Sequence, residues 1–209
     1  MSKKGNSRFD SLVFDLGKVV IDFDWKRPLR KLEGRTPFST GELIARLKST
    51  DAIGRFESGA LSSQNFYREM AEYLKLNVDF EEFTSIWSDI FLDELILDAG
   101  FFEPLKNRYR LILLSNTNEM HTQYLRRQFP ILRVFDQQVM SFEVGAMKPL
   151  EKIYQAAMEA ARTTPERLFY VDDVPAYVEA ATQLGWTSVA FSGKDHLIQH
   201  MHSLGIHTQ

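Results

Sequence analysis

Three short apolar runs in this chain each end at a polar residue. Short apolar runs bounded by polar or turn-forming residues are typical of buried β-strands. The runs are Leu12–Phe14 before Asp15, Leu111–Leu114 before Ser115, and Leu168–Val171 before Asp172 and Asp173. The carboxyl ends of parallel strands meet at one edge of an α/β sheet, and ligands bind in the crevice outside that edge. We therefore expect Asp15, Ser115 and the two adjacent aspartates to lie close together.

Segments with helical character alternate with the apolar runs. Strands are predicted over 11–15, 109–115, 138–142, 168–172 and 188–191, and helices over 98–107, 118–128, 150–161 and 175–184, with a further helical stretch at the end. Thr163 and Glu166 have the spacing of a helix capping box. Val19–Ile21 extend the first strand as a hairpin or flap beyond Gly17. The alternation predicts an α/β protein with a doubly wound, Rossmann-like parallel sheet.

The region from about residue 25 to residue 97 has a different pattern. Apolar residues recur there at helical spacing, and no buried-strand run stands out. Examples are Leu43, Ile44 and Leu47, then Phe66 and Met70, then Phe83, Ile86 and Trp87. This pattern predicts a small helical bundle inserted after the first strand. We expect a Rossmann-like core formed by residues 1–22 and 98–209 and a helical cap formed by residues 23–97.

Composition narrows the classes of function. The chain has 209 residues, of which 44% are hydrophobic and 25% charged, with a net charge of −3 and no cysteine. No basic run favours a nucleic-acid partner, and the missing cysteines exclude disulfides and thiolate chemistry. No apolar segment approaches the roughly 18 residues of a membrane-spanning helix, and no signal-type segment stands out. We expect a cytoplasmic protein with neither a nucleic-acid nor a membrane partner; the oligomeric state is left open.

The predicted cluster of carboxylates needs positive charge. Like charges at close range raise each other's pKa and cost free energy unless a cation intervenes. Lys148, held in an extended segment by Pro149, is one candidate, but it cannot balance three carboxylates. A divalent cation such as Mg²⁺ takes one or two carboxylates together with waters and a substrate phosphate. Taken singly, each aspartate has an ordinary interpretation as a turn or helix-capping residue, although capping accounts for one of Asp172 and Asp173 better than for both.

Small polar residues follow the second strand. Ser115 and Asn116 stand at the start of a predicted helix, where hydroxyl, amide and backbone N–H donors suit a phosphate, although simple N-capping is the alternative. Together with Lys148 and the aspartates they indicate phosphoryl transfer from a small-molecule phosphate ester. Asp15 would attack phosphorus and form an aspartyl-phosphate. Ser115, Lys148 and Mg²⁺ would stabilise the oxygens on which charge spreads in the transition state.

The chain resembles the haloacid dehalogenase-like superfamily, whose members are mostly Mg²⁺-dependent phosphatases. Four short motifs occur in the family order: Phe14-Asp15-Leu16-Gly17, Leu114-Ser115-Asn116, Lys148-Pro149 and Asp172-Asp173. The helical insert is similar to the cap of the subgroup that carries it after the first motif. The resemblance implies that Asp15 is the nucleophile and a metal ligand, and that Gly17 binds the metal through its carbonyl oxygen. It also implies that Asp173 is the direct acidic ligand, with Asp172 a ligand or a partner of Lys148.

Two positions depart from the family pattern. Gly17 stands where a second aspartate usually acts as general acid and base, an effect typically worth about 10²–10⁴-fold in rate. A similar Asp-Leu-Gly motif occurs in some sugar-phosphate phosphatases with glucose-1-phosphate activity, so Gly17 alone does not imply inactivity. Asp22 and Asp24 are candidates for a replacement acid, with solvated turn residues as the alternative. Tyr177 stands where a further Asp or Asn often supports the metal site, and we expect Lys18 to face solvent.

Three functions are compatible with these residues. The first is a Mg²⁺-dependent phosphatase acting on a sugar phosphate or a similar metabolite, with the helical cap closing over the substrate. The second is a hydrolytic dehalogenase that uses Asp15 on carbon, a reaction that needs no metal and no aspartate pair. The third is a protein of the same fold that binds a phosphate ester without turnover, which only Gly17 supports. The phosphatase accounts for the largest number of residues.

Overall fold

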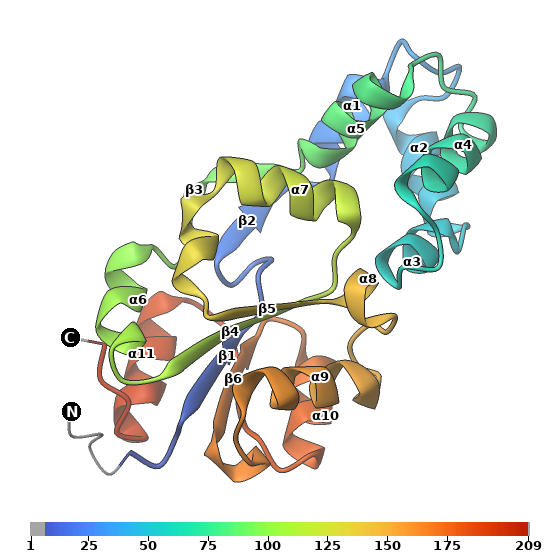
Figure 1. The fold of residues 1–209 in the computed structure, drawn as a ribbon. Helices are drawn as coiled ribbons and strands as arrows, with labels where there is room; N and C mark the ends of the chain where they lie inside the picture. Colours follow the sequence, from blue (N-terminus) through green and yellow to red (C-terminus); the bar gives the residue numbers. More distant parts are fainter. Residues whose placement is uncertain (1–6, 209) are drawn as a thin grey trace.

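A five-stranded parallel sheet forms the centre of the computed structural model, which describes residues 7–208 (Figure 1). Its strands lie in the order β5-β4-β1-β6-β7. Their bounds are β1 (Ser11–Phe14), β4 (Arg110–Ser115), β5 (Gln137–Met140), β6 (Leu168–Asp172) and β7 (Thr187–Ala190). The register places Val13 between Ile112 on one side and Tyr170 on the other. The predicted doubly wound α/β fold is confirmed, and β1 lies in the middle of the sheet.

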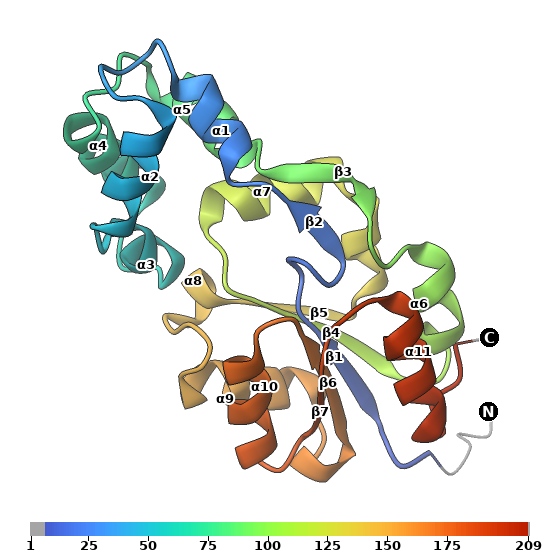
Figure 2. The ribbon, with the colours of Figure 1, turned by 180° about the vertical axis from the view of Figure 1, so that it is seen from behind.

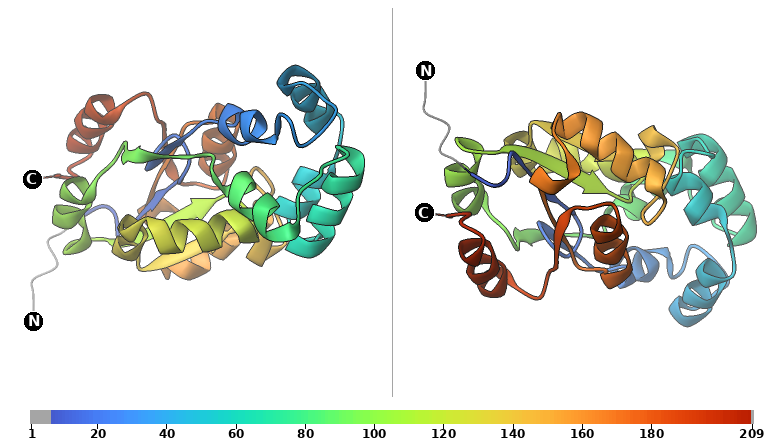
Figure 3. Two further views of the ribbon diagram at one scale, coloured as in Figure 1. Left: turned by 90° about the horizontal axis from the view of Figure 1, so that it is seen from above. Right: turned by 90° about the horizontal axis from the view of Figure 1, so that it is seen from below.

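Helices cover both faces of the sheet (Figure 3). The helices on one face are α6 (Ala99–Lys106), α7 (Glu119–Gln128) and α11 (Lys194–Ser203), and those on the other are α9 (Glu151–Ala161) and α10 (Pro175–Gln183). Leu12 and Phe14 pack into the first layer, whereas Val13, between them, packs into the second. Because both faces are buried, the strands have continuous apolar runs instead of an alternating pattern.

Residues 26–88 fold into five helices that lie together beyond the carboxyl edge of the sheet (Figure 2). These are α1 (Lys26–Leu32), α2 (Thr40–Lys48), α3 (Ala52–Glu57), α4 (Ser63–Tyr73) and α5 (Phe80–Ser88). We call them the helical insert. Their apolar faces share a core around Phe66, Phe83 and Trp87, which also takes in Met120 from α7. The helical periodicity of this region therefore predicted its structure correctly, and the exact extent of a separate cap domain stays a prediction.

The insert is joined to the sheet by a two-stranded antiparallel ribbon, which the sequence pattern did not predict. Its strands are β2 (Ile21–Phe23) and β3 (Phe91–Leu95), with Ile21 opposite Leu95 and Phe23 opposite Phe91. The flap expected around Val19–Ile21 is thus present, but its partner strand lies in a segment where no strand was expected. Most of β3 is solvent-accessible, so the segment lacks the continuous apolar run that marks a buried strand.

Two smaller differences concern helix ends. The capping box expected at Thr163 and Glu166 is wrong: Thr164 precedes a short 3₁₀ helix, η2 (Pro165–Arg167), and no side chain caps it. The Thr163 hydroxyl instead donates to Asp10 Oδ2 (2.7 Å). The strand predicted over 138–142 ends at Met140, where the short helix α8 (Ser141–Val144) begins, and the 3₁₀ helix η1 (Pro130–Val134) was not predicted. Between residues 7 and 208, no helix is both long and apolar enough to cross a membrane.

Candidate active site

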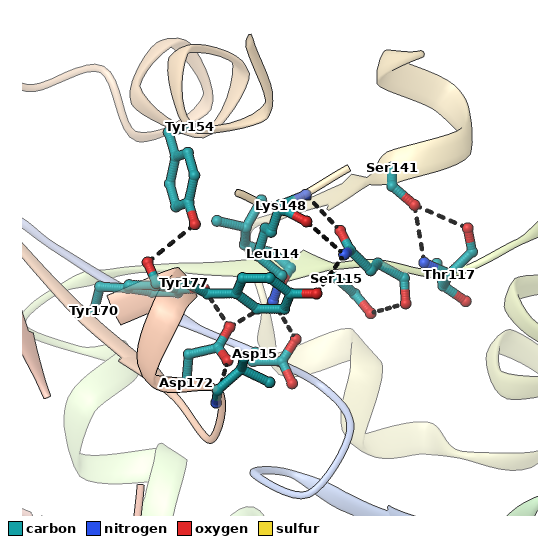
Figure 4. A network of polar contacts seen from close by, with 12 residues as sticks. Asp15, Leu114, Ser115, Thr117, Ser141, Lys148, Tyr154, Tyr170, Asp172 and Tyr177 are labelled. Atoms are coloured by element: carbon teal, nitrogen blue, oxygen red, sulfur yellow. Dashed lines mark hydrogen bonds and ion pairs between the residues drawn. The ribbon is translucent and has the colours of Figure 1, made fainter. Parts of the chain in front are cut away.

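Asp15 lies at the carboxyl edge of the sheet, immediately after the central strand β1. Its backbone N–H donates to the carbonyl of Val171 (2.9 Å), which continues the pairing of β1 with β6 by one residue. The side chain is buried, with 7% of the residue exposed. Ser115, the last residue of β4, and Asp172, the last residue of β6, flank it from the two neighbouring strands (Figure 4). The sheet thus brings together the residues that the three apolar runs had indicated.

The ammonium of Lys148 lies between two carboxylates. Lys148 Nζ donates to Asp15 Oδ1 and to Asp172 Oδ2 at 2.6 Å each, and to the carbonyl of Leu114 at 3.1 Å (Figure 4). These contacts occupy all three N–H bonds of the ammonium group. Burial acts to lower the pKa of Lys148, but the two carboxylates outweigh burial and hold this pKa above its ordinary value. Lys148 is therefore a fixed positive charge inside the site.

Asn116 positions Lys148 through the main chain. Its Oδ1 accepts from the Lys148 backbone N–H (2.8 Å), and its Nδ2 donates to the Lys148 carbonyl (3.1 Å). Nδ2 also lies 3.4 Å from the hydroxyl of Tyr177. Both ends of the amide are thus engaged within the protein. The substrate-binding role predicted for Asn116 stays a prediction, and the structure gives its side chain a supporting role.

The two aspartates of the last motif differ in their surroundings. Asp172 is fully buried; beside Lys148, it accepts from the Tyr170 hydroxyl and from the backbone N–H of Val174 (2.9 Å). Both of its oxygens are therefore engaged. Asp173 is half-buried, and burial, followed by the charge of Asp172, raises the pKa of its carboxyl. The outer carboxylate is the one that remains available to a ligand.

Three carboxylates form a cluster suited to a cation. One oxygen atom from each of Asp15, Asp172 and Asp173 lies within 4.8 Å of the other two. Burial raises the pKa of the Asp15 carboxyl to about 7; Lys148 opposes this shift, and Asp172 and Asp173 add to it. One lysine leaves the cluster short of positive charge. Hard oxygen donors at this spacing fit a magnesium ion, as the sequence predicted.

Ser115 and Gly17 are the remaining predicted site residues. The Ser115 side chain is buried, and its hydroxyl has one long hydrogen bond, to the carbonyl of Asn116 (3.4 Å). The hydroxyl can therefore turn toward a ligand without losing a strong contact. Gly17 lies in the turn from β1 to β2, where it pairs with Ile21. A Cβ at this position would lie only 2.7 Å from Cε1 of Phe23.

The two acidic residues that were candidates to replace the missing acid are already engaged. Asp22 forms an ion pair with Lys18, and the hydrogen bond from Lys18 lowers the pKa of Asp22 below its usual value. Asp24 accepts from the backbone N–H of Lys26 (2.9 Å) at the entry to α1. Lys18 therefore does not simply face solvent as expected, because its ammonium is held by Asp22 and by the carbonyl of Phe23 (2.8 Å).

Sequence reasoning missed Tyr170 and Glu57 near this edge, and it marked Tyr177 only as a departure from the family pattern. Tyr170 reaches Asp172 from within β6, and the Tyr177 ring on α10 lies 5.1 Å from Lys148 Nζ. Glu57, at the end of α3, lies at this edge through its backbone carbonyl, which accepts from the Ser141 hydroxyl (2.6 Å). Tyr170 has a visible signal, since it stands two residues before Asp172 in the same strand. Nothing in the sequence marks Glu57.

The fold and the site define a Rossmann-like α/β hydrolase with an aspartate and a lysine at the carboxyl edge of its sheet. The family model for haloacid dehalogenase-like hydrolases matches residues 57–191, more than half of the chain. The chain therefore belongs to the haloacid dehalogenase-like hydrolases, which confirms the resemblance inferred from its motifs. The matched residues include three of the four motifs; Asp15 lies before them.

Individual relatives support the same assignment. A D-ribitol-5-phosphate phosphatase of Bacteroides thetaiotaomicron is 21% identical over 182 residues, covering 84% of this chain and 88% of the relative. A family enzyme of the same organism, solved with magnesium and inorganic phosphate, superposes with a TM-score of 0.81 at 23% identity, covering 90% of this chain and 98% of that one. A predicted family hydrolase of Porphyromonas gingivalis has a TM-score of 0.78 at 25% identity, with 95% and 98% covered. Together with the family match, the phosphatase relative supports the prediction of a phosphatase.

Proposed function

We propose that this protein is a Mg²⁺-dependent phosphatase that hydrolyses a small phosphate monoester through an aspartyl-phosphate on Asp15. The observation that carries the proposal is the buried set of Asp15, Lys148 and Asp172 beside the half-buried Asp173. A carboxylate held against a fixed cation, at the edge where ligands enter, suits attack on phosphorus. The likeness to a ribitol-phosphate phosphatase and to a structure with bound magnesium and phosphate supports this assignment.

Each residue of the site has a separate role in the proposed reaction. Asp15 attacks phosphorus, the ester oxygen leaves with its alcohol, and water then hydrolyses the aspartyl-phosphate. Lys148 holds Asp15 in place and presents positive charge to the phosphoryl oxygens, and the Ser115 hydroxyl donates to one of them. Asp15, Asp173 and the carbonyl of Gly17 would hold Mg²⁺, with Asp172 next to them. When bound, Mg²⁺ supplies charge that neutralises the carboxylates and the phosphoryl group.

Asp173 is the better candidate of the two aspartates for direct contact with the metal. Lys148 and Tyr170 contact one oxygen of Asp172, and the N–H of Val174 contacts the other. Asp173 is less buried than Asp172. These contacts favour a role for Asp172 in supporting Lys148 and a role for Asp173 in binding the metal.

The helical insert would act as the cap that encloses the substrate and sets specificity. We keep the division that the sequence pattern predicts, with residues 23–97 as the cap and residues 1–22 and 98–209 as the core. A sugar or polyol phosphate is the substrate class that the ribitol-phosphate relative supports. Such a substrate presents several hydroxyls, which polar groups of a closed cap can recognise.

The proposal is tested by measuring phosphate release from a panel of esters with and without Mg²⁺. The panel comprises aldose phosphates, D-ribitol 5-phosphate, glycerol 3-phosphate and 2,4-dinitrophenyl phosphate, and the control is Asp15→Asn. Metal-dependent release that disappears in the variant supports the phosphatase. Binding of Mg²⁺ and phosphate without release from any ester would overturn it in favour of a binding role. Halide release from a 2-haloacid without metal would favour a dehalogenase.

A further inference from the structure

An alkoxide is a poor leaving group, so a phosphatase acting on a sugar or polyol ester needs a proton donor near the ester oxygen. Position 17, two residues after the nucleophile, is a glycine, and the space beside it is filled. The Phe23 ring occupies the place of a side chain there, at 2.7 Å from an added Cβ. Lys18 secures this ring: its ammonium lies 4.7 Å from the ring centre and donates to the Phe23 carbonyl.

The helical insert places one other acid at this edge. Glu57 is the last residue of α3, and its carbonyl accepts from the Ser141 hydroxyl (2.6 Å). The same hydroxyl accepts from the backbone N–H of Thr117 (2.9 Å), two residues after Ser115. One serine of the core thus links the backbone of Glu57 to the segment that follows the second motif.

The turn after Glu57 packs directly on the core. Gly59 has a φ of +74°, and a Cβ there would lie 2.2 Å from the carbonyl oxygen of Phe142 in α8. Only glycine permits this approach, because any other side chain would collide with the main chain. Figure 1 shows α3 lying beside α8. The docked turn fixes where Glu57 stands relative to the core.

The carboxyl of Glu57 has no hydrogen-bond or ion-pair partner among residues 7–208. Burial without a compensating cation raises its pKa to about 7. On the elements packed against α3, Glu143 of α8 is paired with Arg126, and Glu69 of α4 is paired with Arg55. Arg68 and Glu72 of α4 are exposed and have no ion pair within residues 7–208. Burial raises the pKa of Tyr177, on α10, and the charge of Glu57 adds a smaller contribution in the same direction.

We propose that Glu57 is the general acid and base of the reaction, supplied by the helical insert in place of an acid at position 17; this rests on the proposed phosphatase function. The protonated carboxyl gives its proton to the ester oxygen as the P–O bond to the alcohol breaks and the bond from Asp15 to phosphorus forms. The Glu57 carboxylate then takes a proton from the water that attacks the aspartyl-phosphate. Phosphate and the Asp15 carboxylate are released, and Glu57 is protonated again.

The test compares Glu57→Gln with the wild type on two esters that differ in leaving group. For an alkyl ester, such as the best sugar or polyol phosphate of the panel, kcat/KM is expected to fall by about 10²–10⁴-fold. For 2,4-dinitrophenyl phosphate, whose leaving group needs no proton, the first-turnover burst of dinitrophenol is expected to stay within about threefold of wild type. The matched control is Glu143→Gln, an exposed glutamate on the neighbouring α8, for which both rates are expected to be unchanged.

A second readout is the pH profile. For the alkyl ester, the wild-type kcat/KM is expected to fall at alkaline pH as the acid loses its proton. This fall is expected to be absent in Glu57→Gln. Equal losses for both leaving groups, or a rise in KM alone, would overturn the proposal and leave Glu57 as a binding or structural residue. If Glu57→Gln does not fold, Glu57→Asp is used, which keeps the acid but shortens it. Wild-type-like kinetics on both esters in a folded Glu57→Gln would also overturn the proposal, whereas an inactive wild type would instead refute the phosphatase function.

Discussion

Asn116 holds the main chain of Lys148 by both ends of its amide, accepting from the N–H and donating to the carbonyl. Two residues from neighbouring parts of the sheet edge are thereby locked together, although they are 32 positions apart in the chain. The fixed backbone helps to direct the lysine side chain toward Asp15 and Asp172. The family motif that contains Asn116 therefore supports the motif that contains Lys148.

Replacing Asn116 by alanine is expected to lower activity mainly because Lys148 loses the side chain that holds its main chain. The backbone N–H and carbonyl of Lys148 would lose their partners, at a cost of about 1–3 kcal/mol in the free energy of unfolding. We expect kcat to fall by about tenfold or more as Lys148 loses its position. Phosphate release and urea unfolding measure the two effects. An Asn116→Ala variant with wild-type kcat and stability would contradict this role.

Asp173→Asn is expected to weaken Mg²⁺ binding by about tenfold or more, because the site would lose the carboxylate most available to a cation. The Lys148–Asp172 ion pair would remain, so the fold is expected to persist. Calorimetric titration of Mg²⁺ with the wild type and the variant measures the difference. Asp22→Asn serves as the control, because the Asp22 side chain is partly exposed and paired with Lys18 outside the carboxylate cluster. An unchanged Mg²⁺ affinity in Asp173→Asn would indicate that Asp172, and not Asp173, binds the metal.

The ionisation of Glu57 is expected to make stability depend on pH. Its pKa is raised in the folded protein to about 7, above the ordinary value of 4.5. A carboxyl of this kind contributes its stability while protonated, below pH 4.5, and loses the contribution as the pH rises through 7. Glu57→Gln removes this dependence. From pH 5 to pH 8, we expect the free energy of unfolding of the variant to rise relative to that of the wild type. The difference is expected to reach about 1–2 kcal/mol after allowance for solvent screening.

Urea unfolding of both proteins across this pH range, without Mg²⁺, provides the measurement. Glu143→Gln is again the matched control, since Glu143 is exposed and paired with Arg126. A difference between Glu57→Gln and wild type that stays constant from pH 5 to pH 8 would show that Glu57 ionises normally.

Restoring an aspartate at position 17 is not expected to increase activity. Gly17→Asp would press its Cβ against the Phe23 ring and is expected to cost about 1–3 kcal/mol of stability. Gly17→Asp combined with Phe23→Ala makes room for the side chain and is expected to be more active than Gly17→Asp alone. Thermal unfolding and phosphate release of the three proteins test this. If Gly17→Asp alone were stable and more active than the wild type, the Phe23 ring would not block a side chain at position 17.

Much of the core and of the site could be predicted from the sequence because the same apolar runs, each ending at a polar residue, mark both the buried strands and the site residues. Strands buried on both faces require continuous apolar runs, and such runs must end in polar residues where the sheet meets solvent. Asp15, Ser115 and Asp172 were therefore visible as chain positions, and their meeting followed from parallel strands. The ribbon was not visible, because β3 is partly exposed and has no continuous apolar run.

Other features depend on contacts between distant segments, which no local pattern encodes. The position of Glu57 relative to the core depends on Ser141, which binds its carbonyl, and on Gly59, which packs against Phe142. Thr163 has the spacing of a capping residue, yet a tertiary contact with Asp10 takes its hydroxyl instead. Asp22 is not a free candidate for the acid because it forms an ion pair with Lys18. This contact likewise depends on how the segment around Lys18 folds.

The pairing of β2 with β3 has a consequence for how this chain can change over time. The chain leaves the sheet along one strand of the ribbon and returns along the other, so the helical insert is a loop closed at its base by hydrogen bonds of its own. Insertions or deletions among α1–α5 alter neither the register of β1 with β4 and β6 nor the position of Lys148. The insert can thus vary in length and sequence while Asp15, Lys148 and Asp172 keep their places at the edge of the sheet.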